Sequence, residues 1–201
     1  MKKQLIIHPN IRAKRTEVIE DPVVVRVTEF TETGAKDFAK EMDKAENTGQ
    51  TFIPIYIDSY GGECYSLLDM ISTMQRSALP IYTVTGGKGM SCGAMLFAMG
   101  AKRFMSQNAT IMLHEVSSGA WGKVEETKAR IAQTDYLNNL LFAMIAKNCG
   151  HPENYFKDLI HNKSHADWYL NATECKEHNI CTNIGIPTMS VEVSVNYSLI
   201  E

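Results

Sequence analysis

Predicted strands and helices alternate along the first half of the chain, and this alternation limits the available folds more than any other feature of the sequence. Residues 23–27 are rich in β-branched side chains, which predicts a strand, and residues 31–46 have the apolar spacing of a helix. The same order recurs with a strand at 52–58 and a helix at 67–74, and a third strand follows at 81–85. Because strand–helix–strand connections place successive strands parallel, we expect an α/β fold with functional side chains at the C-terminal ends of strands.

A glycine-rich turn carries a serine directly after the third predicted strand. Gly89 and Gly93 stand on either side of Ser91, and the apolar run at 94–99 predicts a buried helix. Glycine permits the sharp turn and the close substrate approach that a nucleophilic hydroxyl needs. We therefore expect Ser91 in the first helical turn, where free backbone N–H groups and the helix dipole stabilise a developing anion.

Two further side chains complete a candidate site for acyl transfer. Short strands are predicted at 102–105 and 110–113, and His114 follows the second of them. A crossover would place His114 beside Ser91, where an imidazole can accept the hydroxyl proton and return it. Asp167, in the loop before the last predicted helix, is the available carboxylate to orient that imidazole.

A second glycine-bearing turn, Gly61-Gly62, follows the second predicted strand and offers backbone donors. Acyl transfer needs N–H groups aimed at the oxygen on which negative charge develops. The four candidate donors are the backbone N–H groups of Gly61, Gly62 and Glu63 and that of Cys92, the residue after the serine. The residues expected to contact substrate are Gly61, Glu63 and Gly119.

The longest helical stretch covers residues 124–149 and changes character halfway along. Residues 124–135 are mostly polar and charged, whereas the second half carries a tight apolar stripe, and Gly150 ends the helix. The polar half is either simply solvated or projects from the body to meet a partner subunit. We expect the second, because this half has too little apolar surface to pack on its own subunit.

The remaining segments indicate one domain with two appendages. The expected units are an arm at 1–21, a domain at 22–185 that includes the long helix, and a tail at 186–201. Residues 151–165 predict a short helix plus a loop, and a last helix is predicted from 167 to about 178. Alternating apolar residues at 190–199 predict a strand in the tail.

Composition argues against several classes of partner and cofactor. Twenty basic and 23 acidic residues give a net charge of −3, which is too balanced to indicate nucleic-acid binding. The apolar run at 5–7 is far too short for a signal peptide, and no apolar stretch of about 18 residues predicts a membrane helix. Five cysteines without a CxxC pair indicate a reduced, cytoplasmic protein. Cys175, His178 and Cys181 have no fourth ligand at a usable spacing, so no metal or other cofactor is expected.

Four segments together resemble one known family. The segments IYIDSYGGE, GKGMSCGAMLFAMGAKRFM, NATIMLHE and DWYLNATECKEHNI are similar, in this order, to the diglycine, serine, histidine and aspartate motifs of the proteolytic subunit of the Clp protease. The resemblance covers approximately residues 53–184. It implies a crotonase-like ββα superhelix, with the helix at 124–149 as the protruding handle through which two seven-membered rings stack.

The resemblance also implies a function. By it, Ser91 is the nucleophile, His114 the base and Asp167 the acid, and Gly62 and Cys92 hold the oxyanion. The implied protein is a serine endopeptidase that hydrolyses peptides or unfolded proteins inside a homo-oligomeric ring chamber. An AAA+ unfoldase is the partner that the family implies, and residues 1–30, which match the family poorly, would form part of its docking surface.

Several residues depart from the family pattern. Tyr60 stands where the family usually has proline before the diglycine, and Cys92 stands where it has methionine. Glu115-Val116 replaces a Gln-Pro pair after the histidine, and the stretch between 151 and 167 is a few residues longer than usual.

The residues alone leave four alternatives open. Cys92 could replace Ser91 as the nucleophile, although successive residues at a helix start point about 100° apart, so only one can face His114. Lys88 or Lys102 could pair with the serine, as in signal-peptide peptidases of the same fold, but the histidine would then have no task. A non-catalytic ring subunit and acyl-CoA chemistry on the same fold are the other two.

Overall fold

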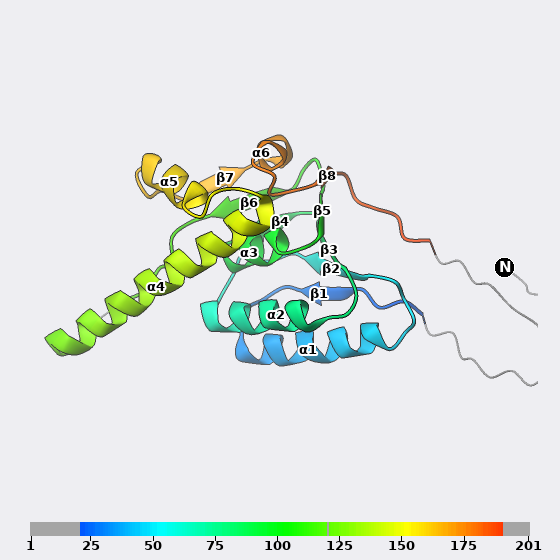
Figure 1. Cartoon of the computed structure of the whole chain (residues 1–201), viewed down its shortest axis with the longest axis horizontal. Helices are drawn as coiled ribbons and strands as arrows, with labels where there is room; N and C mark the ends of the chain where they lie inside the picture. Colours follow the sequence, from blue (N-terminus) through cyan, green and yellow to red (C-terminus); the bar gives the residue numbers. More distant parts are fainter. Residues whose placement is uncertain (1–20, 120, 191–201) are drawn as a thin grey trace, which may run out of the picture.

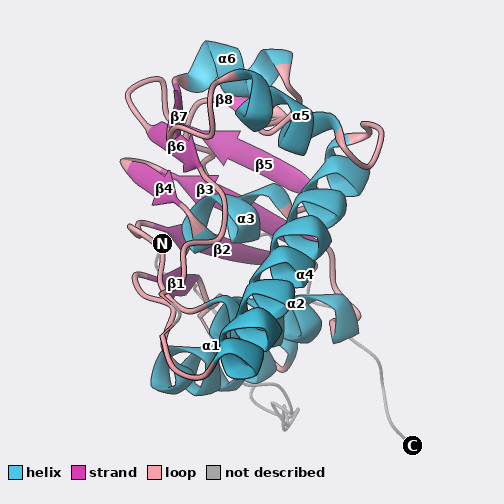
Figure 2. Cartoon of the chain, turned by 90° about the vertical axis from the view of Figure 1, so that its left-hand side faces the viewer, coloured by secondary structure: helices cyan, strands magenta, loops and turns pink. Residues whose placement is uncertain are grey.

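The computed structural model describes residues 21–119 and 121–190, which form two β-sheets with helices packed around them (Figure 1). The strands are β1 (Val25–Val27), β2 (Ile53–Ile57), β3 (Ile81–Thr85), β4 (Lys88–Met90), β5 (Lys102–Met105), β6 (Thr110–Leu113), β7 (Trp168–Leu170) and β8 (Asn183–Ile184). The helices are α1 (Glu32–Glu46), α2 (Cys64–Arg76), α3 (Cys92–Ala98), α4 (Val124–Cys149), α5 (Tyr155–Asn162) and α6 (Ala172–Glu177). In both views α1 and α2 lie at one end of the molecule, and α5 and α6 lie at the other (Figures 1 and 2).

The larger sheet contains the strands that the alternating pattern predicts. Its order is β1-β2-β3-β5-β8, and every neighbouring pair is parallel. The expected α/β fold with a parallel sheet is therefore confirmed. The C-terminal ends of β2 and β3 lead into the two glycine-bearing turns, so both turns lie at the same edge of this sheet.

Helices α1 and α2 pack together and cover the β1 end of this sheet. Phe38 and Met42 of α1 and Leu67 and Met70 of α2 are buried, and these residues recur at helical spacing. Helix α1 starts at a clear cap, because the Thr31 hydroxyl accepts a hydrogen bond from a backbone N–H in the first turn. Each helix thus buries its apolar face, partly against the other helix and partly against the rest of the core.

Strand β4 was not predicted from the sequence, which indicates only a glycine turn at this point. It has no β-branched residue and is part of the smaller sheet, whose order is β4-β6-β7. Its backbone pairs with parallel strand β6, with Met90 opposite Met112, and Gly89 also forms a bridge to Ser59. Tertiary pairing on two sides therefore creates a strand where local propensity is poor.

The prediction of a helix starting at residue 167 was wrong for its first turn. Residues Trp168–Leu170 form β7, which pairs antiparallel with β6 and places Trp168 opposite Leu113. Trp168 and Leu170 are buried while Tyr169 is exposed, an alternation that suits a strand better than a helix. Helix α6 starts only after Asn171, whose side chain caps it.

Helix α4 has the two halves that the sequence predicts. Its first half is exposed, with Val124, Ile131 and Tyr136 among the exposed large apolar residues of the molecule. Its second half packs against α3 and α5 and buries Leu137 and other apolar residues. Figure 1 shows the first half extending away from the sheets, and the second half lying beside them. The projection of the polar half is therefore confirmed.

Both predicted appendages fall largely outside the described residues. The arm at 1–21 and the strand at 190–199 are described only at Asp21 and Ser190. Residues 186–189 are described, and they line an apolar cavity of about 310 Å³ with side chains of the larger sheet such as Tyr56 and Tyr82. In the described part of the chain, no helix combines the length and apolar character needed to cross a membrane.

Candidate active site

Ser91 lies between β4 and α3 in a strained backbone conformation. Its φ is 52° and its ψ is −120°, a combination that residues with a side chain rarely adopt. Hydrogen bonds hold it on both sides, because its N–H donates to the Met112 carbonyl at 2.9 Å and its own carbonyl accepts from the Met95 N–H at 3.1 Å. A sharp, strained turn from a strand into a helix presents the serine hydroxyl for reaction.

Pairing of β4 with β6 brings Ser91 and His114 together. Each of the two residues directly follows its strand, and the register places Met90 opposite Met112. The Ser91 Oγ lies 2.8 Å from the Nε2 of His114. At this distance an imidazole nitrogen can accept the hydroxyl proton, which is the arrangement of an activated nucleophile.

The diglycine turn passes so close to Ser91 that it has no room for a side chain. Gly61 has φ 112°, and a Cβ on it would lie 2.7 Å from the Ser91 Cβ. Gly62 has φ 152°, and a Cβ on it would lie 2.5 Å from the carbonyl oxygen of Phe30. Glycine at both positions therefore lets the backbone of this turn lie directly against Ser91 on one side and against Phe30 on the other.

Two of the four predicted N–H donors are already occupied. The Gly61 N–H donates to the Ser59 Oγ at 3.1 Å, and the Glu63 N–H donates to the Phe30 carbonyl at 2.9 Å. Within residues 21–119 and 121–190, the N–H groups of Gly62 and Cys92 donate no hydrogen bond. The donors open to an oxyanion are thus reduced to these two, and the Cys92 N–H opens α3, where the helix dipole adds to its effect.

The Cys92 side chain contacts the diglycine turn and Cys64. Its thiol is buried and donates to the Gly62 carbonyl at 3.2 Å, which ties the two turns together. A hydrogen bond with Cys64, followed by burial, raises the pKa of the Cys92 thiol, and the same bond lowers the pKa of Cys64 to about 7. A buried thiol held in its protonated form is a poor nucleophile, so the geometry favours Ser91.

Lys88, the lysine nearest to Ser91 in the sequence, is held by other groups. Its Nζ lies 2.8 Å from the Asp58 Oδ1 and 4.6 Å from the centre of the Tyr60 ring. The hydrogen bond with Asp58 is the main cause that raises the pKa of Lys88. A lysine that acts as a general base needs a lowered pKa, so these contacts argue against a serine–lysine pair. Lys102 lies over the Tyr82 ring in the larger sheet.

Asp167 directly precedes β7, and the register that pairs Trp168 with Leu113 sets it opposite His114. It is exposed between α5 and β7, and in the described part of the chain it forms no hydrogen bond or ion pair. The Nδ1 of His114 has no hydrogen-bond partner among those residues either. The structure thus joins Ser91 to His114 by a hydrogen-bond contact and sets Asp167 opposite His114 without such a contact. Gly119 lies exposed in the loop between β6 and α4, near the Trp121 ring.

Three residues in and around the segment after His114 have no role predicted from the sequence. Glu115, His165 and Asn138 form a connected set of polar contacts between this segment, the loop before β7 and helix α4. No sequence pattern indicates these contacts, because the residues that form them are far apart in the sequence and belong to different elements. The departure of Glu115 from the family pattern was the one available signal.

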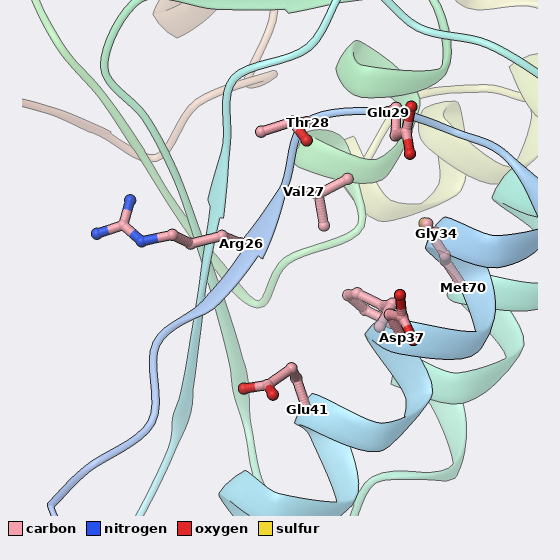
Figure 3. Close-up of a pocket in the computed structure, with 9 residues that line it drawn as sticks. Arg26, Val27, Thr28, Glu29, Gly34, Asp37, Glu41 and Met70 are labelled. Atoms are coloured by element: carbon pink, nitrogen blue, oxygen red, sulfur yellow. The ribbon is translucent and has the colours of Figure 1, made fainter.

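A cavity elsewhere on the molecule is acidic and does not include the candidate site. It has a volume of about 180 Å³ and lies between β1 and α1. Figure 3 shows the carboxylates of Glu29, Asp37 and Glu41 on its helix side, with the Arg26 side chain directed away from them. Neither Ser91 nor His114 lines it, so it carries no part of the acyl-transfer geometry.

Comparison with known proteins gives concordant results. A family model described as Clp protease matches residues 10–187. The ATP-dependent Clp protease proteolytic subunit 1 of Rhodopirellula baltica is 29% identical over 143 residues. That alignment covers 70% of this chain and 61% of the relative, so the chain spans less than two thirds of the length of that curated protein.

Proposed function

This chain belongs to the Clp protease family, and we propose that it is a serine endopeptidase acting on peptides or unfolded proteins. The observation that carries the proposal is the 2.8 Å contact between the Ser91 Oγ and the His114 Nε2, made at a strained strand-to-helix turn. Two open backbone N–H groups, those of Gly62 and Cys92, lie at the adjoining turns. Nucleophile, base and oxyanion donors are the parts that acyl transfer requires.

The proposed reaction proceeds in two halves. The Ser91 Oγ attacks the peptide carbonyl carbon while its proton passes to the His114 Nε2. The resulting oxyanion accepts hydrogen bonds from the N–H groups of Gly62 and Cys92. His114 then donates its proton to the leaving amine, which leaves an acyl group on Ser91. A water molecule gives its proton to His114, attacks the acyl carbon and regenerates the serine.

We assign to Asp167 the role of orienting His114 in the assembled particle. Its present position, without a bond to His114, is explained if assembly completes the site. The polar first half of α4 would dock on its counterpart across stacked heptameric rings and order the loop at 119–122. That loop follows His114 by only a few residues, so fixing the loop would also fix the positions of His114 and Asp167.

An ATP-dependent unfoldase is a further proposed partner, by analogy with the printed name of the Rhodopirellula baltica relative. The peptidase chemistry has the stronger support, because residues 1–20, which would form part of the docking surface, lie outside the described part of the chain. The family model nevertheless extends into this segment, since its match begins at residue 10. A non-catalytic ring subunit is the second candidate function, and the lack of a hydrogen bond between Asp167 and His114 favours it.

Labelling with a fluorophosphonate, together with hydrolysis of an unstructured peptide, tests the proposal. Wild-type protein is expected to be labelled and active, whereas Ser91→Ala should lose labelling and about 10⁴-fold or more of the rate. Ser118→Ala is a matched control, because Ser118 is exposed and its hydroxyl forms a hydrogen bond only with Thr134 of α4 among the described residues.

Two outcomes would redirect the assignment. An active Ser91→Ala protein that a thiol-selective reagent inactivates would make Cys92 the nucleophile. A wild-type particle of full size that is neither labelled nor active would establish the non-catalytic ring subunit instead.

A further inference from the structure

Glu115 connects the candidate base to the loop that carries Asp167. It directly follows His114, and its Oε2 lies 2.7 Å from the Nδ1 of His165. Residues 163–167, here called the acid loop, lead from the end of α5 to β7 and contain both His165 and Asp167. The side chains of His165 and Glu115 are 48% and 34% exposed, so water weakens this ion pair without removing it.

The acid loop is held in an unfavourable backbone conformation. Ser164 has φ 61° and His165 has φ 58°, so two consecutive residues with side chains adopt left-handed values. Such residues persist only where their surroundings hold them. The His165 N–H donates to the Ile160 carbonyl at 3.0 Å, its ring packs edge-on against His161, and Trp168 anchors the other end of the loop. The contact with Glu115 connects His165, in the middle of the loop, to the residue that directly follows His114.

The same carboxylate also reaches helix α4. The Oε1 of Glu115 accepts a long hydrogen bond of 3.5 Å from the Nδ2 of Asn138, whose Oδ1 accepts from the Val116 N–H at 3.0 Å. Asn138 is only 7% exposed, and both ends of its amide are used by the two residues that follow His114. A buried amide with both ends bonded fixes the backbone around it.

We propose that Glu115 is a positioning residue for the proposed triad, an inference that rests on the proposed function. Asp167 follows His165 by two residues, which span at most about 7 Å of extended chain. The pairing of β7 with β6 sets Asp167 opposite His114, and the contact of Glu115 with His165 fixes the backbone on the other side of Asp167. Glu115 also bonds Asn138 of α4, so its position changes when α4 moves. Docking of α4 and approach of Asp167 to His114 are therefore coupled through the Glu115 side chain.

Removing either partner of the ion pair tests the proposal. His165→Asn keeps a residue type that tolerates left-handed φ, and Glu115→Gln keeps the shape of the side chain while removing its charge. Each variant is expected to lower kcat of the assembled particle about fivefold, near the upper limit for a pair exposed to this extent, with KM unchanged. The double variant should be no slower than either single variant, because both changes remove the same contact.

Two further variants separate the ion pair from a general structural effect. Ser164→Asn changes the neighbouring left-handed residue without touching the pair, and it should keep the wild-type kcat. The charge swap Glu115→Lys with His165→Asp restores a pair of opposite charges, again with a residue that tolerates left-handed φ at 165. It should recover most of the rate that each of its two component variants loses.

Hydrogen exchange of the acid loop gives a readout that does not depend on catalysis. Exchange at 163–167 should accelerate in Glu115→Gln and His165→Asn, while native mass stays at the wild-type value. Unchanged kcat or unchanged exchange in these variants, while Ser91→Ala is inactive, overturns the role of Glu115 alone. An increase in kcat also overturns it, because the pair would then hold Asp167 away from His114. If Ser91→Ala is fully active, the proposed function fails and this inference fails with it.

Discussion

Replacement of Gly61 by alanine should disable Ser91, the proposed nucleophile, through one added methyl group. The new Cβ would lie 2.7 Å from the Ser91 Cβ and 3.1 Å from the Ser91 Oγ. Ordinary contact begins at 3.4 Å, so the two carbon atoms have to separate by about 0.7 Å. Ser91 cannot absorb this shift freely, because its strained backbone is fixed by hydrogen bonds to Met112 and Met95.

The expected loss of activity follows from this displacement. A misplacement of about 1 Å in a reacting group costs about 10²-fold in rate, so kcat of Gly61→Ala should fall by about that factor. The left-handed φ of 112° adds a conformational penalty, which should lower the free energy of unfolding by about 1–3 kcal/mol. Steady-state hydrolysis measures the first quantity, and urea unfolding measures the second.

Gly49→Ala separates the two effects. Gly49 also has a left-handed φ, of 79°, but a Cβ on it would meet no atom within 4 Å. This control should lose stability without losing kcat. The reasoning is refuted if Gly61→Ala keeps the wild-type kcat, or if Gly49→Ala loses as much activity as Gly61→Ala.

Two other predictions concern assembly and pH. Charge reversal at Glu125 and Glu126, or Ala129→Pro, should lower native mass and hydrolysis together, and single rings with the wild-type specific activity would contradict this. Burial lowers the pKa of His178 from its usual 6.5, so the unfolded chain binds the proton at higher pH than the folded chain. The contribution of neutral His178 to the free energy of unfolding should therefore be fully present above pH 6.5, and the free energy of unfolding should decrease as pH falls below 6.5. Urea titrations of His178→Gln should lack that decrease, and an identical decrease in the variant would exclude His178 as its source.

The sequence predicted those parts of the fold in which local signals and tertiary packing agree. Strand β3 and helix α4 have the predicted bounds, because β-branched runs, apolar periodicity and a terminal glycine all mark them. Strand β4 carried no such mark, since its three residues Lys88, Gly89 and Met90 become a strand only through pairing with β6 and Ser59. Strand β7 was predicted as part of a helix, because the strong helix signal that starts at Asn171 directly follows it.

The candidate site divides in the same way. Ser91 and His114 could be paired from the sequence, because each follows a strand end at a distance that a short crossover spans. The position of Asp167 could not be derived, since it depends on the pairing of β7 with β6 and on the conformation of a loop with two left-handed residues that are not glycine. The Glu115–His165 contact also depends on that conformation, and no local pattern encodes it.

The left-handed backbone of Ser91 places stability and chemistry in opposition at one position. A glycine at 91 would adopt the observed φ of 52° without strain, so Ser91→Gly should remove a cost of about 1–3 kcal/mol while deleting the hydroxyl. Engineering of this chain for heat resistance alone would therefore tend to discard the serine. Any stabilisation programme has to hold position 91 constant and seek its gains elsewhere, because a thermal screen cannot distinguish relief of strain here from a genuine improvement of the enzyme.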